Sequence, residues 1–325
     1  MGDSMQNERD SAVNGSSLND GLNGGPNKPD LRAAMRLYIF IFILLLTIGA
    51  LAQTLHFEIG MIVTQVLLIL LPALWFLRRH RVDISGFARL KPLRAGFVPT
   101  IIILAASMWV LNMIIASGMV TGLMEFGYEP ITVLEPPETL QEYLILLLVL
   151  SVFAGICEEV LFRGAIMPSM EGHGLVPAVV FSSLLFALFH VTFLNLFSTF
   201  ILGMVMAVVV IKTGSLWGGI LYHMANNAIA VTYLYIAGQQ ETATEIDPQG
   251  YWVLLPLFLV AVAGSYFSLR LLQKQSGIEP LLKNRKNWLP RGWFSAAFVA
   301  AVILFLIMAL LEFAIGFNWF GLAEL

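Results

Sequence analysis

Charged residues and cysteine are both scarce in this sequence. Asp, Glu, Lys and Arg make up only 12% of its 325 residues, whereas 58% are hydrophobic and the mean hydropathy is +0.82. Soluble proteins have about a quarter of their residues charged, so the composition excludes an ordinary soluble domain, a disordered chain and a nucleic-acid-binding protein. The single cysteine, Cys157, lies in an apolar run, which excludes an internal disulfide and a cysteine zinc site. The sequence is therefore typical of an integral membrane protein.

The first 33 residues lack aromatic side chains and are rich in Gly, Asn, Ser and Asp. Such a segment buries too little apolar surface to order itself, so we expect a disordered polar tail over residues 1–33. An apolar run long enough to span a membrane begins only near Ala33. This is not the pattern of a cleavable signal peptide, whose apolar part is shorter and follows a short basic lead.

Apolar runs of about 20 residues, the length of a helix that crosses ~30 Å of hydrocarbon, recur through residues 34–317. They predict an all-α fold, a polytopic integral membrane helical bundle of about nine spans, with a short C-terminal end at residues 318–325. The expected spans cover residues 35–55, 58–77, 96–117, 142–162, 176–194, 196–212, 216–237, 251–272 and 294–316. Little more than Asn195 separates the fifth from the sixth, so one long helix, and eight spans, is the alternative. Pro168 and nearby glycines predict a re-entrant or interfacial piece over residues 164–174.

Loop charges assign the two faces of the bundle, because cytoplasmic loops carry an excess of Lys and Arg. The loops at residues 78–94 and 274–291 are basic, whereas those at residues 125–138 and 241–247 carry acidic residues without basic ones. An odd number of spans with a cytoplasmic N-terminus places all four on their expected sides. We expect the protein in the cell (inner) membrane.

Strongly polar side chains within the expected spans are few and concentrated. A charged group at the bilayer centre is costly, so a cluster of them predicts a functional site. They fall on the fourth, fifth and seventh spans: Glu158, Glu159, Arg163, His190, His223, Asn226 and Asn227.

The spacing of these residues assigns some of them to common helix faces. Glu159 and Arg163 are four residues apart and can form an ion pair, whereas Glu158 points to another side of the helix and is free to act on water. His223 and Asn227 are also four apart and can donate hydrogen bonds to a developing oxyanion. Since no Ser or Cys lies beside a histidine as a nucleophile, the set favours direct attack by a water molecule, activated by the carboxylate and one histidine.

Three short motifs occur in order within these hydrophobic segments. They are E-E-x-x-x-R (Glu158, Glu159, Arg163), F-x-x-x-H (Phe186, His190) and H-x-x-x-N (His223, Asn227). Together they resemble the CPBP family of intramembrane proteases, also called CAAX protease and bacteriocin-processing or Abi proteins, which includes the CAAX prenyl endopeptidases. The resemblance covers about residues 140–237, the expected protease-like core.

The resemblance implies an endopeptidase that hydrolyses a peptide bond within or beside the bilayer. Carried over by position, Glu158 and His190 would activate the water. The other motif residues would support that pair or stabilise the oxyanion: Glu159 with Arg163 in the first role, and His223 with Asn227 in the second.

Metal dependence is a separate question, because the family is commonly classed as metalloproteases. Glu158, His190 and His223 are the candidate zinc ligands. The motif H-E-x-x-H is absent, and the candidates come from three different helices. Zinc and a metal-free, glutamate-dependent mechanism therefore both stay open, and no organic cofactor is expected.

Two other functions compete with the hydrolase. In a proton-coupled transporter the same groups would form a relay, and in an inactive scaffold they would only fix helix register. Single motifs also have ordinary interpretations: the glutamate pair as the interfacial end of a span, His190 as a core histidine, and His223 with Asn227 as interhelical hydrogen bonds. For the hydrolase we expect a peptide or membrane-protein substrate, prenylated or not, in contact with the lipid bilayer, and no nucleic acid.

Overall fold

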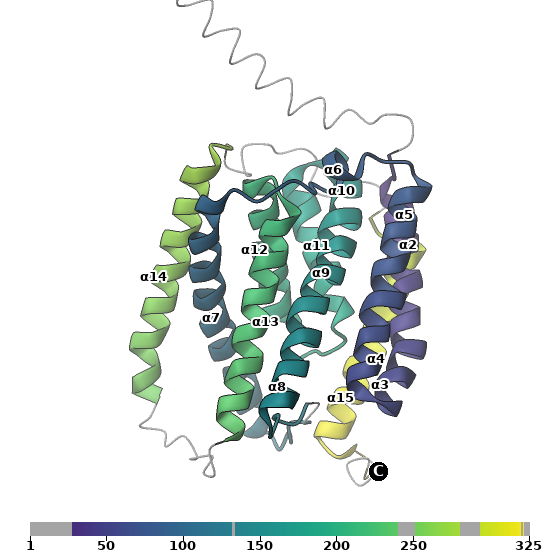
Figure 1. The fold of residues 1–325 in the computed structure, drawn as a ribbon. Coiled ribbons are helices and arrows are strands. Elements are labelled where there is room, and N and C mark those ends of the chain that lie inside the picture. The colour runs from purple at the N-terminus through teal and green to yellow at the C-terminus, as the bar shows by residue number, and fades with distance from the viewer. Residues whose placement is uncertain (1–27, 132–133, 240–250, 280–292, 320, 322–325) are drawn as a thin grey trace, which may run out of the picture.

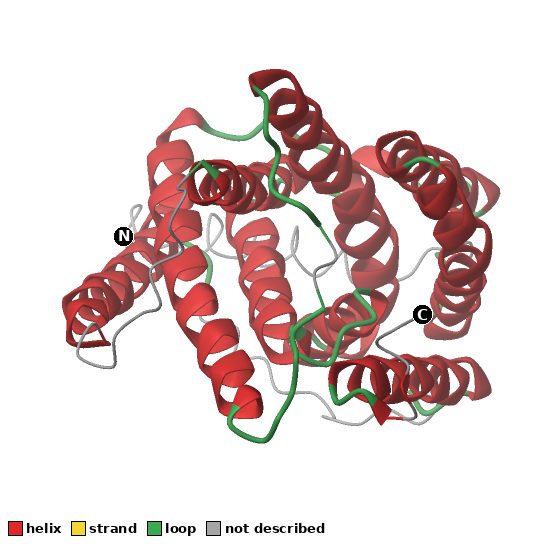
Figure 2. Cartoon of the chain, turned by 90° about the horizontal axis from the view of Figure 1, so that it is seen from below, coloured by secondary structure: helices red, strands yellow, loops and turns green. Residues whose placement is uncertain are grey.

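The computed structural model describes residues 28–131, 134–239, 251–279, 293–319 and 321. Within these ranges the chain is helical and contains no β-strand, which confirms the predicted all-α bundle (Figure 1). Seen from below, the helices run beside one another and loops join their ends (Figure 2). Most of the predicted tail, the acidic loop at residues 241–247 and most of the basic loop at residues 274–291 lie outside the described residues.

Four composite helical segments come first in the chain. They are α2 (Leu31–Leu44), η1 (Leu45–Gly49) and α3 (Ala50–Leu55); α4 (Phe57–Val63), η2 (Thr64–Leu70) and α5 (Leu71–Arg79); η3 (Ala95–Phe97) and α7 (Val98–Met124); and α8 (Leu140–Leu146), η4 (Leu147–Phe153), α9 (Ala154–Glu159), η5 (Val160–Ile166), α10 (Met167–Met170) and η6 (Glu171–His173). A short helix, α6 (Ile84–Phe87), lies between the second and the third. The pieces η1, η2, η4 and η5 are π-helical.

Five single helices follow in the described part of the chain. They are α11 (Leu175–Phe189), α12 (Leu196–Thr213), α13 (Leu216–Gly238), α14 (Tyr251–Ser276) and α15 (Ala296–Gly316). Helical segments thus lie at all the predicted positions, and the first begins at Leu31, slightly before the predicted boundary. The fifth and sixth are two helices separated by residues 190–195, rather than one long helix.

The number of membrane-length helices differs from the number predicted. Among the described residues, 7 helices are long and apolar enough to cross a membrane. The predicted fifth span, α11, has 15 residues and extends only roughly 22 Å. The predicted seventh span, α13, is 23 residues long, but His223, Asn226 and Asn227 make it less apolar. The two exceptions are therefore helices that carry the polar motifs.

The fourth segment is longer than predicted. The helix continues through Gly164 and Pro168 and gives way to a 3-10 turn only at Glu171–His173. The helix break predicted from Pro168 is therefore wrong, while an interfacial position of residues 164–174 stays a prediction. Pro168 lies in the first turn of α10, directly after the π-helical η5. The N–H that proline lacks therefore falls where the helix changes type, and the helix tolerates it. The chain turns at Gly174, whose φ is +119°.

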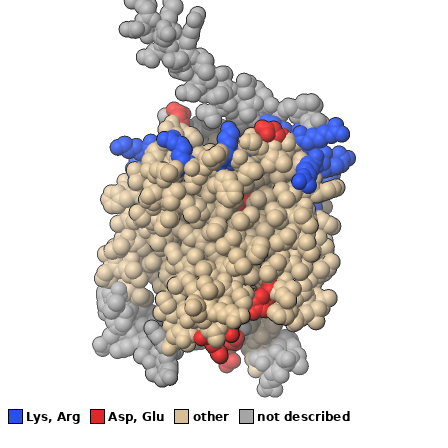
Figure 3. Space-filling view, viewed as in Figure 1, with Lys and Arg blue, Asp and Glu red and all other residues tan. Residues whose placement is uncertain are grey.

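The helices around the fourth segment bring distant parts of the chain together. α9 packs against η2 and α13, while η5 contacts α2, α5 and α11, and α11 packs along α12. On the face shown in Figure 3, the Lys and Arg side chains gather at the upper end, where α5 ends and α7 begins in Figure 1. The basic loop at residues 78–94 lies at this end of the bundle, and its cytoplasmic side stays a prediction.

Candidate active site

A buried ion pair lies near the middle of the fourth segment. Glu159 and Arg163 are both 0% exposed, and Glu159 Oε1 lies 2.7 Å from Arg163 Nη1. Arg163 Nη2 also donates to the backbone oxygen of Gly203 on α12, at 2.9 Å. The guanidinium carbon lies 4.6 Å from the centroid of the Phe186 ring on α11. The ion pair expected from the four-residue spacing forms, and it joins the fourth segment to α11 and α12.

His223 reaches this ion pair from α13. Its Nδ1 lies 3.3 Å from Glu159 Oε1, and the residue is buried. Because a carboxylate can only accept a hydrogen bond, Nδ1 carries the proton in this contact, which leaves Nε2 to act on a ligand. Glu159 thus holds both a guanidinium and an imidazole, and it orients the histidine as a catalytic carboxylate does. The sequence alone pairs His223 with Asn227 and does not indicate this contact.

Two glycines allow the helices to approach closely around Glu159. A Cβ atom at Gly219 would lie 2.7 Å from Glu159 Oε2 and 2.5 Å from Val210 Cγ2. A Cβ atom at Gly155 would lie 2.7 Å from Met224 Cγ. Larger residues would therefore force neighbouring side chains or the helices themselves to shift, so these glycines allow α13 to pack closely against α9 and α12.

Glu158 lies on another side of the same helix and has its own partner. It is 7% exposed, and its Oε1 accepts a hydrogen bond of 2.8 Å from Nε2 of Gln65 on η2. Its Oε2 is buried and has no hydrogen-bond partner among the described residues. One carboxylate oxygen is thus fixed in place and the other is unengaged. Because both glutamates are buried inside the bundle, the interpretation of the pair as the interfacial end of a span is wrong.

His190 lies at the C-terminal end of α11. Its Nδ1 lies 2.8 Å from the backbone oxygen of Phe186, and since that oxygen only accepts, Nε2 is the ring nitrogen able to accept a proton. The Phe186 ring centroid lies 4.6 Å from that of His190 and 5.9 Å from that of His223. The two imidazoles and Arg163 therefore contact one phenyl ring, which joins the second motif to the other two.

Asn227 is held by contacts to neighbouring backbone and side chain. Its Nδ2 donates to the backbone oxygen of Leu150 on η4 at 2.8 Å, and its Oδ1 accepts from Asn226 Nδ2 at 3.2 Å. These contacts join α13 to η4, as interhelical hydrogen bonds between polar residues do in membranes. The expected role of Asn227 at an oxyanion stays a prediction.

Glu158, Glu159 and His190 all lie several helical turns from the end of the bundle at which the fourth segment passes into α11. Arg89 and Glu171 form a bidentate ion pair at the upper end of the bundle. Glu159 precedes Glu171 on the fourth segment by about 12 residues, or roughly 18 Å, and His190 follows Leu175 on α11 by about 15 residues, or roughly 22 Å.

The residues present do not form a metal site of the usual kind. Among the described residues, no group of three or more His, Cys, Asp and Glu side chains is placed to hold a metal ion. The proposed ligands Glu158, His190 and His223 instead engage Gln65, a backbone oxygen and Glu159. The arrangement therefore fits acid–base chemistry by the side chains better than zinc ligation.

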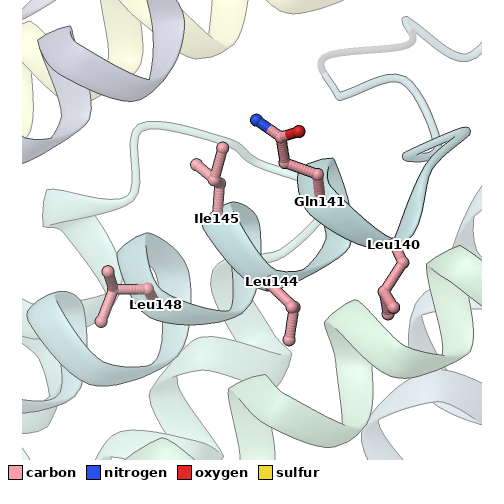
Figure 4. Close-up of a pocket in the computed structure, with 5 residues that line it drawn as sticks. All are labelled: Leu140, Gln141, Leu144, Ile145 and Leu148. Atoms are coloured by element: carbon pink, nitrogen blue, oxygen red, sulfur yellow. The ribbon is translucent and has the colours of Figure 1, made fainter.

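An apolar groove in the described part of the chain lies away from these residues. It has a volume of about 620 Å³ and is lined by Leu140, Gln141, Leu144, Ile145 and Leu148 near the start of the fourth segment (Figure 4). Its last lining residue precedes Glu158 by about ten residues, or roughly 15 Å along the helix. The groove is apolar and open, as expected for a surface that faces lipid, so the chemistry is assigned to the polar cluster.

Comparison with known proteins gives a match to a protein-family model. Residues 140–229 match the family model described as type II CAAX prenyl endopeptidase Rce1-like. No curated protein and no solved structure matches the chain. The matched range begins with α8 and ends within α13, so it contains all three motifs and the helices that carry the polar cluster.

Proposed function

We propose, on the match of residues 140–229 to the type II CAAX prenyl endopeptidase Rce1-like family, that the chain is a protease of this family and hydrolyses peptide bonds with a water molecule activated by Glu158 and His190. The observation that carries this proposal is the state of the Glu158 carboxylate. Gln65 fixes one oxygen, while the other is buried and without a partner among the described residues. A carboxylate so placed can take the proton of a water molecule as it attacks.

His190 is the second base in this proposal. Its hydrogen bond to the Phe186 backbone fixes the tautomer with the proton on Nδ1, which leaves Nε2 as an acceptor. As the water oxygen bonds to the substrate carbonyl carbon, its proton passes to the Glu158–His190 pair, and the carbonyl becomes an oxyanion. Return of that proton to the leaving nitrogen breaks the C–N bond. The products are a carboxylic acid and an amine.

Glu159, Arg163 and His223 act as one unit in support of that step. Arg163 balances the charge of Glu159, and Glu159 orients His223 through Nδ1. When protonated, His223 can donate from Nε2 to the oxyanion, in a site from which water is largely excluded. Asn227 is proposed as a further donor. No step requires zinc, and elemental analysis of the purified protein decides whether a metal is present.

The proposed substrate is a peptide at the C-terminal end of a prenylated protein. The carboxylates lie roughly 18 Å below the level of the Arg89–Glu171 pair, so a substrate must enter the hydrocarbon region to reach them. A lipid-modified peptide does so at less cost than a polar one. The basic face is proposed to be cytoplasmic, in line with the usual excess of Lys and Arg on that side.

Cleavage of matched peptides tests this function. Purified protein in detergent is given a farnesylated peptide and the same peptide without the lipid, and mass spectrometry identifies the bond that is cut. We expect cleavage of the farnesylated peptide by the wild type and loss of cleavage in a folded Glu158→Gln variant. That pair of results also excludes the scaffold. Equal cleavage by the variant would remove Glu158 from the mechanism.

A further inference from the structure

The turn that follows His190 has an unusual backbone. α11 ends at Phe189, His190 is its C-cap, and the next residue, Val191, has φ of +61°. The left-handed region is unfavourable for a β-branched residue, so a valine there marks strain that the surroundings must maintain. Because Val191 is bonded directly to His190, relaxation of this strain would move the imidazole.

A carboxyl group from the last helix holds this turn. Glu312 Oε2 on α15 accepts a hydrogen bond of 2.6 Å from the backbone N–H of Phe193, and Glu312 is also hydrogen-bonded by the backbone of Leu194. The rings of Phe193 and Phe313 lie 5.1 Å apart. The residue after the carboxylate therefore packs against the same turn.

The position of Glu312 is itself fixed by the segment that follows α7. Glu129 donates its backbone N–H to the backbone oxygen of Gly316 at 2.7 Å. The Tyr128 ring packs edge-on against Phe313 and Phe317, and a Cβ atom at Gly316 would clash with that ring. The C-terminal end of α15 is thus anchored independently of α11.

Glu312 supplies acceptor oxygens for two backbone N–H groups of the turn, those of Phe193 and Leu194. These residues lie outside a regular helix, so their N–H groups have no acceptor from a helical hydrogen-bond ladder. Without Glu312, the turn would have to rearrange to satisfy the Phe193 and Leu194 amides.

We infer that Glu312, outside the matched range 140–229, is a positioning residue that holds the strained turn after α11 and thereby places His190. This inference rests on the proposed role of His190 in water activation. Glu312 acts through the backbone of residues 193–194 and not on the substrate. Helix α15 then contributes to the geometry of the active site and does not only face lipid.

Variants of Glu312 and Val191 test the inference. We expect Glu312→Ala to lower kcat about 10- to 100-fold, as a misplaced catalytic group does, with KM within about twofold. Glu312→Gln keeps an acceptor oxygen and is expected to retain most of the activity. Val191→Gly removes the strain and, combined with Glu312→Ala, should restore part of kcat. The control Glu58→Ala removes a carboxylate whose partner is His56 and should leave kcat unchanged.

Several results would overturn the inference. Wild-type kcat in Glu312→Ala would do so. So would equal losses in Glu312→Gln and Glu312→Ala, because charge rather than hydrogen bonding would then be responsible. If adding Val191→Gly to Glu312→Ala does not raise kcat, the carboxylate does not act through the conformation of this turn.

Hydrogen exchange separates this inference from the proposed function. Glu312→Ala should speed amide exchange in residues 190–195 and leave α13 protected, whether or not a cleavable peptide is in hand. Unchanged amide exchange in residues 190–195 would show that Glu312 does not stabilise the turn. If Glu158→Gln proves fully active while Glu312→Ala shows faster exchange, the water-activation proposal fails and the structural role of Glu312 stands.

Discussion

Gln65 on the second helical segment donates a hydrogen bond of 2.8 Å to Glu158 on the fourth. Both side chains are buried, and Gln65 lies outside the range that matches the protease family. The amide leaves the other carboxylate oxygen of Glu158 unengaged. Gln65 is therefore expected to select the orientation in which Glu158 meets water.

Replacing Gln65 by Leu should lower kcat about 10- to 100-fold, because the freed carboxylate adopts other rotamers and the catalytic geometry is lost. Steady-state cleavage of the farnesylated peptide measures the effect. Asn112→Leu is a matched control, since it removes an amide from α7 at a site that the proposed mechanism does not use. If both variants cleave at the wild-type rate, Gln65 does not position Glu158.

The buried ion pair makes a prediction about stability. Arg163→Met leaves Glu159 buried without its cation, which should lower the free energy of unfolding by about 3–5 kcal/mol. Adding Glu159→Gln removes the uncompensated charge and should recover part of that loss. Thermal unfolding in detergent measures the stability of the single and the double variant.

The same double variant should stay catalytically impaired, because His223 has lost the carboxylate that orients it. Recovery of full activity together with stability would show that the ion pair is only structural. Persistent instability in the double variant would show that the unpaired charge is not the cause of the loss.

Gly219→Ala tests the close packing of α13 against α9. The new Cβ atom would lie 2.7 Å from Glu159 Oε2, so either Glu159 or the helix must shift, at a cost of about 1–3 kcal/mol. Gly122→Ala is the control, because a Cβ atom at Gly122 meets nothing within 4 Å. The unfolding temperature and kcat should both be lower in Gly219→Ala than in the wild type, and both should be unchanged in Gly122→Ala. Equal behaviour of the two variants would contradict the packing argument.

Metal removal gives a further prediction. The described candidate ligands engage other protein groups and do not form a three-residue metal group, so dialysis against a chelator should leave kcat unchanged. Elemental analysis should find no stoichiometric zinc. Loss of activity on chelation, restored by zinc alone, would place the metal in the mechanism.

The helices and the local pairs could be predicted from the sequence, because both depend on short-range periodicity. Apolar runs located the helical segments, and the four-residue spacing of Glu159 and Arg163 gave their ion pair. The three motifs gave the resemblance to CAAX proteases, and residues 140–229 match a model of that family.

Contacts between distant segments could not be predicted in this way. Nothing in the spacing indicates that Gln65 meets Glu158, that Glu159 meets His223, or that Glu312 supports the turn after His190. The end of the fourth segment was also missed, because proline and glycine usually end helices, whereas here the helix changes type at Pro168. A lone polar residue in an apolar span was the available signal for Gln65 and Glu312.

The most direct test of the proposed mechanism is the ratio of kcat for wild type and Glu158→Gln with the farnesylated peptide, measured on proteins with the same unfolding temperature. The proposal predicts a fall of about 100-fold or more, the usual contribution of a general base. A Glu158→Gln protein that cleaves the peptide as fast as the wild type would contradict it.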